Sequence, residues 1–104
     1  MSAYCFFDVR EITNPKKVEE YQAGVAATVE QYGGRYLVLG GSFDVIEGDW
    51  RPGFPVIVEF PSLDQAHRWY DSVEYRPLKS LRLAGTRSNA VFIDGYSVAQ
   101  GECP

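Results

Sequence analysis

The chain has 104 residues, a formal charge of −4 and an ordinary composition, 45% hydrophobic and 23% charged, which fits one soluble globular domain. Its basic residues form no patch, so no nucleic-acid partner is expected. No apolar run reaches the roughly 18 residues of a membrane-spanning helix, so no membrane partner is expected either. The first residues do not resemble a signal peptide, and we therefore predict a cytoplasmic protein.

Cysteine and histidine are too few and too dispersed for a metal site. Cys5 falls in a predicted strand and Cys103 in the C-terminal tail, and both are expected to be free thiols. His67 is the sole histidine. The sequence also has no phosphate loop and no dinucleotide fingerprint. We predict neither a metal nor a cofactor.

The first half of the chain predicts strand, helix and strand. Residues 3–9 are aromatic and β-branched, as in a strand that is covered on both sides. Asn14 and Pro15 are typical of a helix start, and apolar residues then recur at helical spacing until Gly33. Residues 35–40 predict a second strand that starts at Arg35. The glycine pair at 40–41 predicts a bulge or bend, after which residues 42–48 resume an extended segment.

The second half predicts strand, helix and strand again. Residues 54–60 alternate as a strand. Ser62 is expected to cap a helix, with Gln65 completing a capping box. This helix is expected to break at residues 72–77 and to restart near Pro77, ending about Ala84. Residues 89–96 predict the last strand. We expect one domain over residues 1–97 and a loose tail over 98–104.

This order predicts an α+β, ferredoxin-like βαββαβ fold. Right-handed crossovers give a four-stranded antiparallel sheet with strand order 4-1-3-2 and the helices on one face. Tyr4, Phe6 and Ile57 are expected on the other face, where no helix covers them. Because such an apolar patch is costly in water, we predict a homodimer that closes through this helix-free face, as in a dimeric α/β barrel.

Three runs of sequence carry a resemblance to a known family. They read YGGRYLVLGGSFDVIEGDWRP, VIVEFPS and WYDSVEYRPLKSLR. Together they resemble the small bacterial family of domain of unknown function 1330, over nearly the whole chain. The resemblance implies a dimeric α/β-barrel fold, in a superfamily that includes cofactor-free monooxygenases, isomerases, dehalogenases and haem enzymes. It implies no settled activity. Leu39 departs from the family, whose members often have a basic residue there, which bears on ligand choice.

Charged residues near the predicted sheet are the first candidates for chemistry. Arg35 could hold an acidic substrate with its bidentate guanidinium; the alternative is a salt bridge at the rim. Asp8 and Glu59 are expected on the helix-free face, too far apart for a close acid pair. Each could act as a general base, or could pair with Arg10 or Arg35 across a dimer.

The second predicted helix supplies the other candidates. His67 is the one side chain that titrates near neutrality and could move a proton, although its position favours a solvated face. Trp69, Tyr70 and Tyr75 cluster at the helix break and could line a substrate pocket, or could simply fill the core. Two further arginines, Arg51 and Arg82, are secondary candidates for contacting an anion.

Two functions follow from these patterns. The first is a homodimer that binds a small aromatic or oxo acid and acts on it without a cofactor, as a monooxygenase, isomerase or lyase would. The second is a non-catalytic dimeric module that binds a metabolite or serves assembly. A convergent acid and base within one pocket would favour the first.

Overall fold

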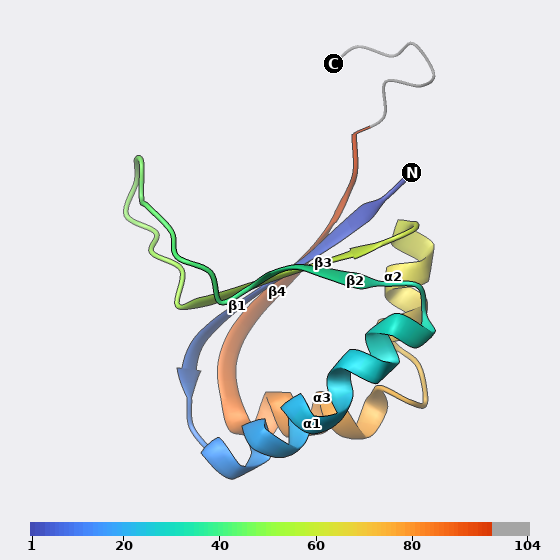
Figure 1. Cartoon of the computed structure of the whole chain (residues 1–104). Helices are drawn as coiled ribbons and strands as arrows, with labels where there is room; N and C mark the ends of the chain where they lie inside the picture. Colours follow the sequence, from blue (N-terminus) through green and yellow to red (C-terminus); the bar gives the residue numbers. More distant parts are fainter. Residues whose placement is uncertain (97–104) are drawn as a thin grey trace.

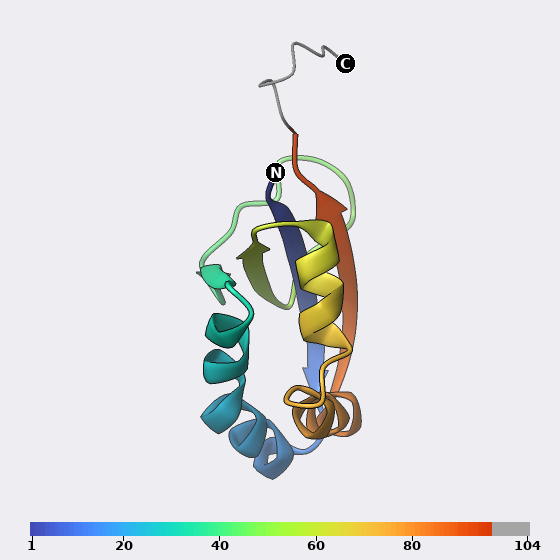
Figure 2. The ribbon, with the colours of Figure 1, turned by 90° about the vertical axis from the view of Figure 1, so that its right-hand side faces the viewer.

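The computed structural model describes residues 1–96, and its elements confirm the predicted order. They are β1 (Ala3–Ile12), α1 (Pro15–Gln31), β2 (Arg35–Leu39), β3 (Phe54–Phe60), α2 (Leu63–Tyr70), α3 (Arg76–Gly85) and β4 (Thr86–Asp94). The strands pair antiparallel in the order β2-β3-β1-β4, which is the predicted order read from the other edge. All three helices lie on one face of the curved sheet (Figures 1 and 2). The fold is ferredoxin-like.

The first glycine pair joins α1 to β2. The helix starts at Pro15, where Asn14 Oδ1 accepts a hydrogen bond from Lys17 N. It ends before Gly33, whose φ of +81° is in the left-handed region that favours glycine. A Cβ on Gly34 would lie 2.6 Å from the Phe60 ring, so the second glycine allows the chain to pass close to the core.

The second glycine pair ends β2 rather than bending it. Gly40 has a φ of +67°, and its N–H donates to the carbonyl of Pro55. The irregularity in the β2–β3 ladder lies between Tyr36 and Val38, before the glycine pair at which it was predicted. The extended segment predicted at residues 42–48 joins no ladder. Residues 40–53 instead form a long loop, here called the arm, that projects from the sheet (Figure 1).

The predicted break between the second and third helices is present. Ser62 caps α2 as expected, but the Gln65 amide donates to the carbonyl of Tyr32 and completes no capping box. At the break, Ser72 Oγ donates to the carbonyl of Trp69 and accepts from Tyr75 N. A single hydroxyl therefore pairs backbone groups of both helix ends.

The bounds of β1 and β4 differ from the prediction. β1 continues to Ile12, and β4 begins at Thr86 and ends at Asp94. The two strands pair along their whole length, with a register shift between Val9 and Glu11, so pairing extends each beyond its apolar run. The tail predicted at residues 98–104 lies outside the described residues.

The two faces of the sheet are unlike. Cys5, Phe7 and Val58 point toward the helices and are buried in the core with Trp69 and Tyr75. The alternate residues of the strands face the other way, where no helix lies (Figure 2). This arrangement separates a helix side, which holds the core, from a helix-free face.

Candidate functional site

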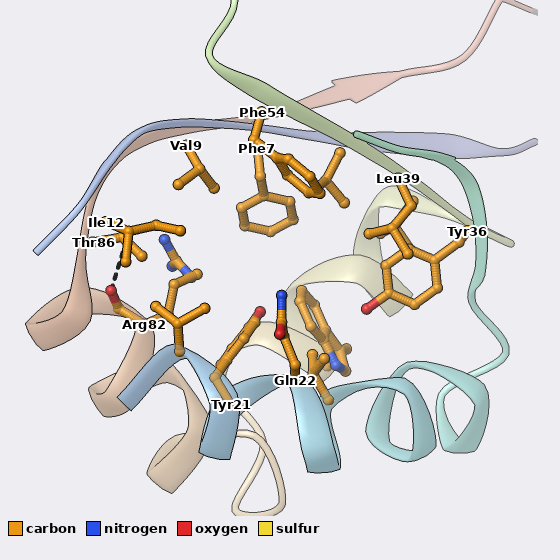
Figure 3. A pocket seen from close by; sticks show the side chains of 15 residues that line it. Phe7, Val9, Ile12, Tyr21, Gln22, Tyr36, Leu39, Phe54, Arg82 and Thr86 are labelled. Atoms are coloured by element: carbon orange, nitrogen blue, oxygen red, sulfur yellow. Dashed lines mark hydrogen bonds between the residues drawn. The ribbon is translucent and has the colours of Figure 1, made fainter. Parts of the chain in front are cut away.

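A cavity lies between the sheet and the helices. Its volume is about 130 Å³, and its wall is mostly apolar. Residues from all seven helices and strands line it (Figure 3). Its polar side chains are few: Tyr21, Gln22, Tyr36, Arg82 and Thr86. An apolar cleft with a few convergent polar groups is typical of a small-molecule site.

Arg82 is the charged group of this cavity. It comes from α3, is 5% exposed, and its guanidinium extends toward β1 among Phe7, Val9 and Ile12 (Figure 3). The guanidinium carbon lies 5.2 Å from the centre of the Phe7 ring. Within residues 1–96, no carboxylate forms an ion pair with it. A buried arginine without a carboxylate partner is unusual, because burying an unpaired charge costs on the order of several kcal/mol.

Tyrosine hydroxyls surround the guanidinium. Arg82 Nε donates to Tyr75 Oη at 3.3 Å, and Nη2 approaches Tyr70 Oη at 3.5 Å. Tyr75 Oη is in turn 2.9 Å from Tyr21 Oη, which lines the cavity. Burial would lower the pKa of Arg82, but its interactions with the Tyr75 hydroxyl outweigh this effect and raise the pKa. The guanidinium is charged at any neutral pH.

The tyrosines of the site are neutral hydroxyl groups at physiological pH. Burial raises the pKa of Tyr21 and of Tyr75 above the usual value. Burial also raises the pKa of Tyr36, on the opposite side of the cavity, to about 12. Each of these hydroxyls can donate a hydrogen bond to a bound molecule. The site therefore combines one fixed cation with neutral donors in an apolar wall.

Exposed apolar side chains mark the mouth of the cavity. Ile12, Leu39 and Phe54 line it and are each more than two-fifths exposed. Gln22 is exposed and extends toward the space between them and α1 (Figure 3). Leu39 is the position at which the sequence departs from its resemblance, so this departure lies at the mouth of the cavity.

Asp8 lies on the helix-free face, as predicted, but its hydrogen bonds are already taken. Gly53 N donates to it at 2.8 Å, Trp50 Nε1 at 3.1 Å and Arg10 Nη1 at 3.0 Å. Burial alone would raise the pKa of Asp8, but these three donors outweigh burial and hold it below the usual value. Arg10 also donates to the carbonyl of Arg51. These contacts tie the base of the arm to β1.

Arg35 and Glu59 pair with each other on neighbouring strands. Arg35 Nε lies 2.7 Å from Glu59 Oε1, and the arginine side chain is 74% exposed. Hydrogen bonds from Ser2 and Arg35 lower the pKa of Glu59. This geometry matches the rim salt bridge that the sequence allowed for Arg35. Neither residue lines the cavity.

The aromatic candidates cluster around the helix break. The Trp69 ring lies 4.1 Å from Tyr75 and 6.1 Å from Tyr70, between ring centroids. Trp69 lines the cavity and donates to Thr28 Oγ1, while Tyr75 lies behind the wall, bonded to Arg82. His67 is exposed on α2, where its ring meets Phe92 at 5.2 Å. It does not reach the cavity.

The sequence reasoning ranked Arg82 below Arg35 and missed Tyr21 and Tyr36. A signal was present, because Tyr75, Leu78, Arg82 and Gly85 follow one another at steps of three and four along α3. That spacing places Arg82 on the inward stripe of the helix, and the structure buries Tyr75, Arg82 and Gly85.

The described residues include neither a candidate metal site nor a candidate membrane span. In residues 1–96, no three His, Cys, Asp or Glu side chains are close enough to hold a metal ion. No helix in the same range is long and apolar enough to cross a membrane.

Comparison with known proteins gives a family and a fold. The family described as Domain of unknown function (DUF1330) matches residues 2–96. No curated protein sequence matches the chain significantly. Several solved structures are similar in fold, and three are described. A protein of unknown function from Rhodopseudomonas palustris has 17% identity and a TM-score of 0.73, covering 92% of this chain and 83% of that one.

The other two structures are more distant. A dimeric ferredoxin-like protein of unknown function from Jannaschia sp. CCS1 has 10% identity and a TM-score of 0.68, covering 91% of this chain and 100% of that one. SnoaB, a cofactor-independent oxygenase from Streptomyces nogalater, has 14% identity and a TM-score of 0.55, covering 94% of each chain. At these identities the likeness establishes the fold alone.

Proposed function

Because this chain belongs to the family described as Domain of unknown function (DUF1330), whose description states no activity, we propose a function from its own cavity. The protein binds a small aromatic or oxo acid, in anionic form, between its sheet and its helices. Arg82 is the counterion of that ligand, and Trp69, Tyr21 and Tyr36 surround the ligand body.

One observation carries this proposal: Arg82 is buried without a carboxylate partner among the described residues. Burial opposes the charge, and hydroxyl groups compensate only part of that cost. An anion from solution would complete the pairing inside an apolar wall, where charge attraction is stronger than in water. The aromatic wall favours a flat, apolar ligand body.

Cofactor-independent oxidation is the chemistry we propose for such a ligand. An activated CH2 group of the substrate loses a proton to give its carbanion or enolate, which reduces dioxygen. Both C–H bonds are replaced by a C=O bond to one oxygen atom, and the other oxygen atom leaves as water with the two hydrogens. A fixed cation and hydroxyl donors would stabilise the anion on which this reaction depends. The similarity in fold to a cofactor-independent oxygenase is compatible with this role. Asp8, Glu59 and His67 remain proposals as proton carriers, and none lines the cavity.

The second candidate is the non-catalytic binding module. It is favoured by a specific observation, because no carboxylate or imidazole lines the cavity to remove a proton. The two candidates share the anion site and differ in turnover. Oxygen consumption in the presence of each ligand that binds separates them.

We also propose that the protein is a homodimer closed through the helix-free face. Val91 and Ile93 on β4 are about half exposed there, beside the half-buried Tyr4, Phe6 and Ile57. Trp50 of the arm packs against Phe6 with the rings tilted and their centroids 5.6 Å apart, but is itself 56% exposed. A second copy would cover this apolar surface. The similar Jannaschia protein is described as dimeric.

A thermal-shift screen with paired ligands tests the anion site. The panel holds aromatic carboxylic acids, aromatic oxo acids and acidic phenols, each with its neutral amide or methyl ether. We expect the anions to raise the unfolding midpoint and the neutral partners to have little effect. Arg82→Met should abolish the response, whereas Arg68→Met, in an exposed helical pair with Asp64, should keep it.

Arg35→Met decides between the two arginines. If the response is lost in Arg35→Met and kept in Arg82→Met, the site lies where the sequence first indicated and the proposal for the cavity is wrong. Equal stabilisation by acids and by their amides would also contradict it, since the charge would then play no part.

A further inference from the structure

The hydrogen bonds behind the cavity wall run in one direction. Arginine can only donate, so Arg82 Nε–H donates to Tyr75 Oη across the 3.3 Å contact. Tyr75 is fully buried, and its own hydroxyl hydrogen needs an acceptor. Among the described residues, the acceptor within reach is Tyr21 Oη, at 2.9 Å.

The opposite direction leaves a hydrogen without a partner. If Tyr21 donated to Tyr75, the Tyr75 oxygen would accept two hydrogen bonds while its own O–H remained unpaired in the core. A buried donor without an acceptor costs about 1–3 kcal/mol. This cost favours Tyr75 as the donor to Tyr21, which leaves the Tyr21 hydroxyl hydrogen to point elsewhere.

That hydrogen is available to the cavity. Tyr21 lines the cavity from α1, and Figure 3 shows its hydroxyl at the inner end of the side chain, facing the space below Phe7. Among the described residues, the hydrogen-bond partner of the Tyr21 hydroxyl is Tyr75. A ligand oxygen beside Tyr21 would accept a hydrogen bond from its hydroxyl. The oxygen of that hydroxyl would itself accept from Tyr75, which in turn accepts from Arg82.

One edge of the guanidinium is already occupied. Its Nε and Nη2 both face tyrosine hydroxyls, of Tyr75 and Tyr70. A ligand can therefore be held only at the other end, by the remaining N–H groups of Nη1 and Nη2. The Tyr21 hydroxyl adds one further donor at a single point of the cavity, which suits a ligand with one charged oxygen there.

We infer that Arg82, Tyr75 and Tyr21 form a directional hydrogen-bond chain that recognises the single oxyanion of a phenolate or enolate, with Tyr21 Oη–H as the donor that contacts it. This inference rests on the proposed function and names its substrate class: a weakly acidic aromatic or enolic hydroxyl compound, bound as its anion. Tyr75 contacts no ligand in this scheme and is a positioning residue.

Binding of 4-nitrophenol tests the chain, since its absorption reports its ionisation. With the wild-type protein, we expect bound nitrophenol to ionise at a lower pH than free nitrophenol, while its methyl ether, 4-nitroanisole, binds much more weakly. Tyr21→Phe should weaken nitrophenolate binding about tenfold, the effect of losing a hydrogen bond to a charged group. It should also reduce the shift in the ionisation of the bound dye.

A double-mutant cycle on Tyr21 and Tyr75 tells whether their hydroxyls act together in one hydrogen-bond chain or contribute to ligand binding independently. Tyr75→Phe should weaken nitrophenolate binding, and Tyr21→Phe with Tyr75→Phe together should cost little more than the larger single loss. Tyr36→Phe removes another hydroxyl of the cavity that lies outside the chain, so its effect should add to that of Tyr75→Phe. Additive losses for Tyr21 and Tyr75 would overturn the inference.

The remaining outcomes are equally decisive. If nitrophenolate binding depends on Arg82 but Tyr21→Phe binds as the wild type does, the chain is wrong while the anion site stands. If the wild-type protein binds no aromatic anion saturably, the proposed function itself fails. Should Tyr75→Phe not fold, the comparison of Tyr21→Phe with Tyr36→Phe decides: equal binding by these two variants overturns the inference.

Discussion

On the helix-free face, Asp8 accepts hydrogen bonds from Gly53, Trp50 and Arg10, whereas beneath the helices Arg82 meets tyrosine hydroxyls and, within residues 1–96, no carboxylate. Both groups are buried to a similar extent, at 4% and 5% exposure. One carries a complete set of partners and the other does not. We interpret the first as a charge that stabilises the fold and the second, under the proposed function, as a charge available to a ligand.

The contrast also shows that a charged group's availability to a ligand depends more on its hydrogen-bond partners than on how open its surroundings are. Asp8 and the Arg35–Glu59 pair lie on the more open face, where a ligand would seem to have easier access. Their hydrogen bonds are nevertheless made within the protein, which leaves them little to offer a substrate. Arg82 lies deeper, and within residues 1–96 its side-chain hydrogen bonds come from Nε and Nη2, which leaves Nη1 available. The following predictions test this comparison in order of decreasing effect.

The largest effect is expected from a charge on the helix-free face. Val91→Asp places a carboxylate among Phe6, Ile93 and their neighbours, where the proposed second copy must exclude water. A buried unpaired charge costs several kcal/mol, so the dimer should weaken by about 100-fold or more. Sedimentation velocity over a dilution series measures this.

Leu83→Asp is the control for that variant. Leu83 is 60% exposed on α3, on the helix side, and a charge there should leave the assembly unchanged. Equal sedimentation of wild type and Val91→Asp would show that the two copies do not meet through this face.

Asp8→Asn should destabilise the fold. The amide oxygen can still accept from Gly53, but an NH2 group replaces the oxygen that accepts from Trp50 and Arg10, and the negative charge is lost. We expect a loss of about 2 kcal/mol in the free energy of unfolding. Urea unfolding, compared with Asp44→Asn on the exposed part of the arm, gives the value.

The same carboxylate predicts a pH dependence. The pKa of Asp8 is below its usual value in the folded state, so the unfolded chain binds this proton more readily. The stabilisation is complete above the unfolded pKa of about 3.9 and is lost as the pH falls through the lower, folded pKa. Asp8→Asn should therefore show a flatter stability curve between neutral and acidic pH. Parallel curves for the two proteins would contradict this account.

Arg82→Met is expected to change stability in the opposite direction. Methionine matches the aliphatic stem of arginine and removes a buried charge that lacks a carboxylate partner among the described residues, although Tyr75 loses a donor. We expect an increase of about 1 kcal/mol in the free energy of unfolding without ligand. A clear loss of stability would mean that Arg82 supports the fold itself.

The smallest effect is expected from Arg35→Met. The side chain is 74% exposed, and salt bridges of this kind contribute little to stability. We expect an unchanged unfolding midpoint, together with a rise in the pKa of Glu59 toward its usual value, because one of its donors is removed. Titration of Glu59 by NMR measures that rise. A large fall in the midpoint would show that this face depends on the pair.

Much of the fold was predictable because local signals agree with it. Asn14 and Pro15 start α1, Gly33 ends it, and alternation in β1 and β3 identifies the strand faces. The arm was not predictable, since residues 42–48 have strand-like composition and only the absence of a pairing partner leaves them as a loop. Strand limits such as Thr86 likewise depend on pairing rather than on composition.

The candidate site was harder to predict for a related reason. Helical spacing places Arg82 on an inward stripe, but spacing cannot tell whether a carboxylate from another element meets it there. Arg35 drew attention because it opens a strand beside glycines, and its partner Glu59 is 24 residues away. Whether a charge is satisfied depends on contacts between distant segments, and the sequence alone does not reveal those.

A crystal structure with a brominated aromatic anion is the most direct test of the site. We predict an anomalous bromine signal in the cavity between β1 and α1, with the ligand oxyanion within hydrogen-bond distance of Arg82. A ligand that instead sits on the helix-free face, with its oxyanion at Arg35 or Arg10, would contradict the assignment of Arg82 as the anion-binding residue.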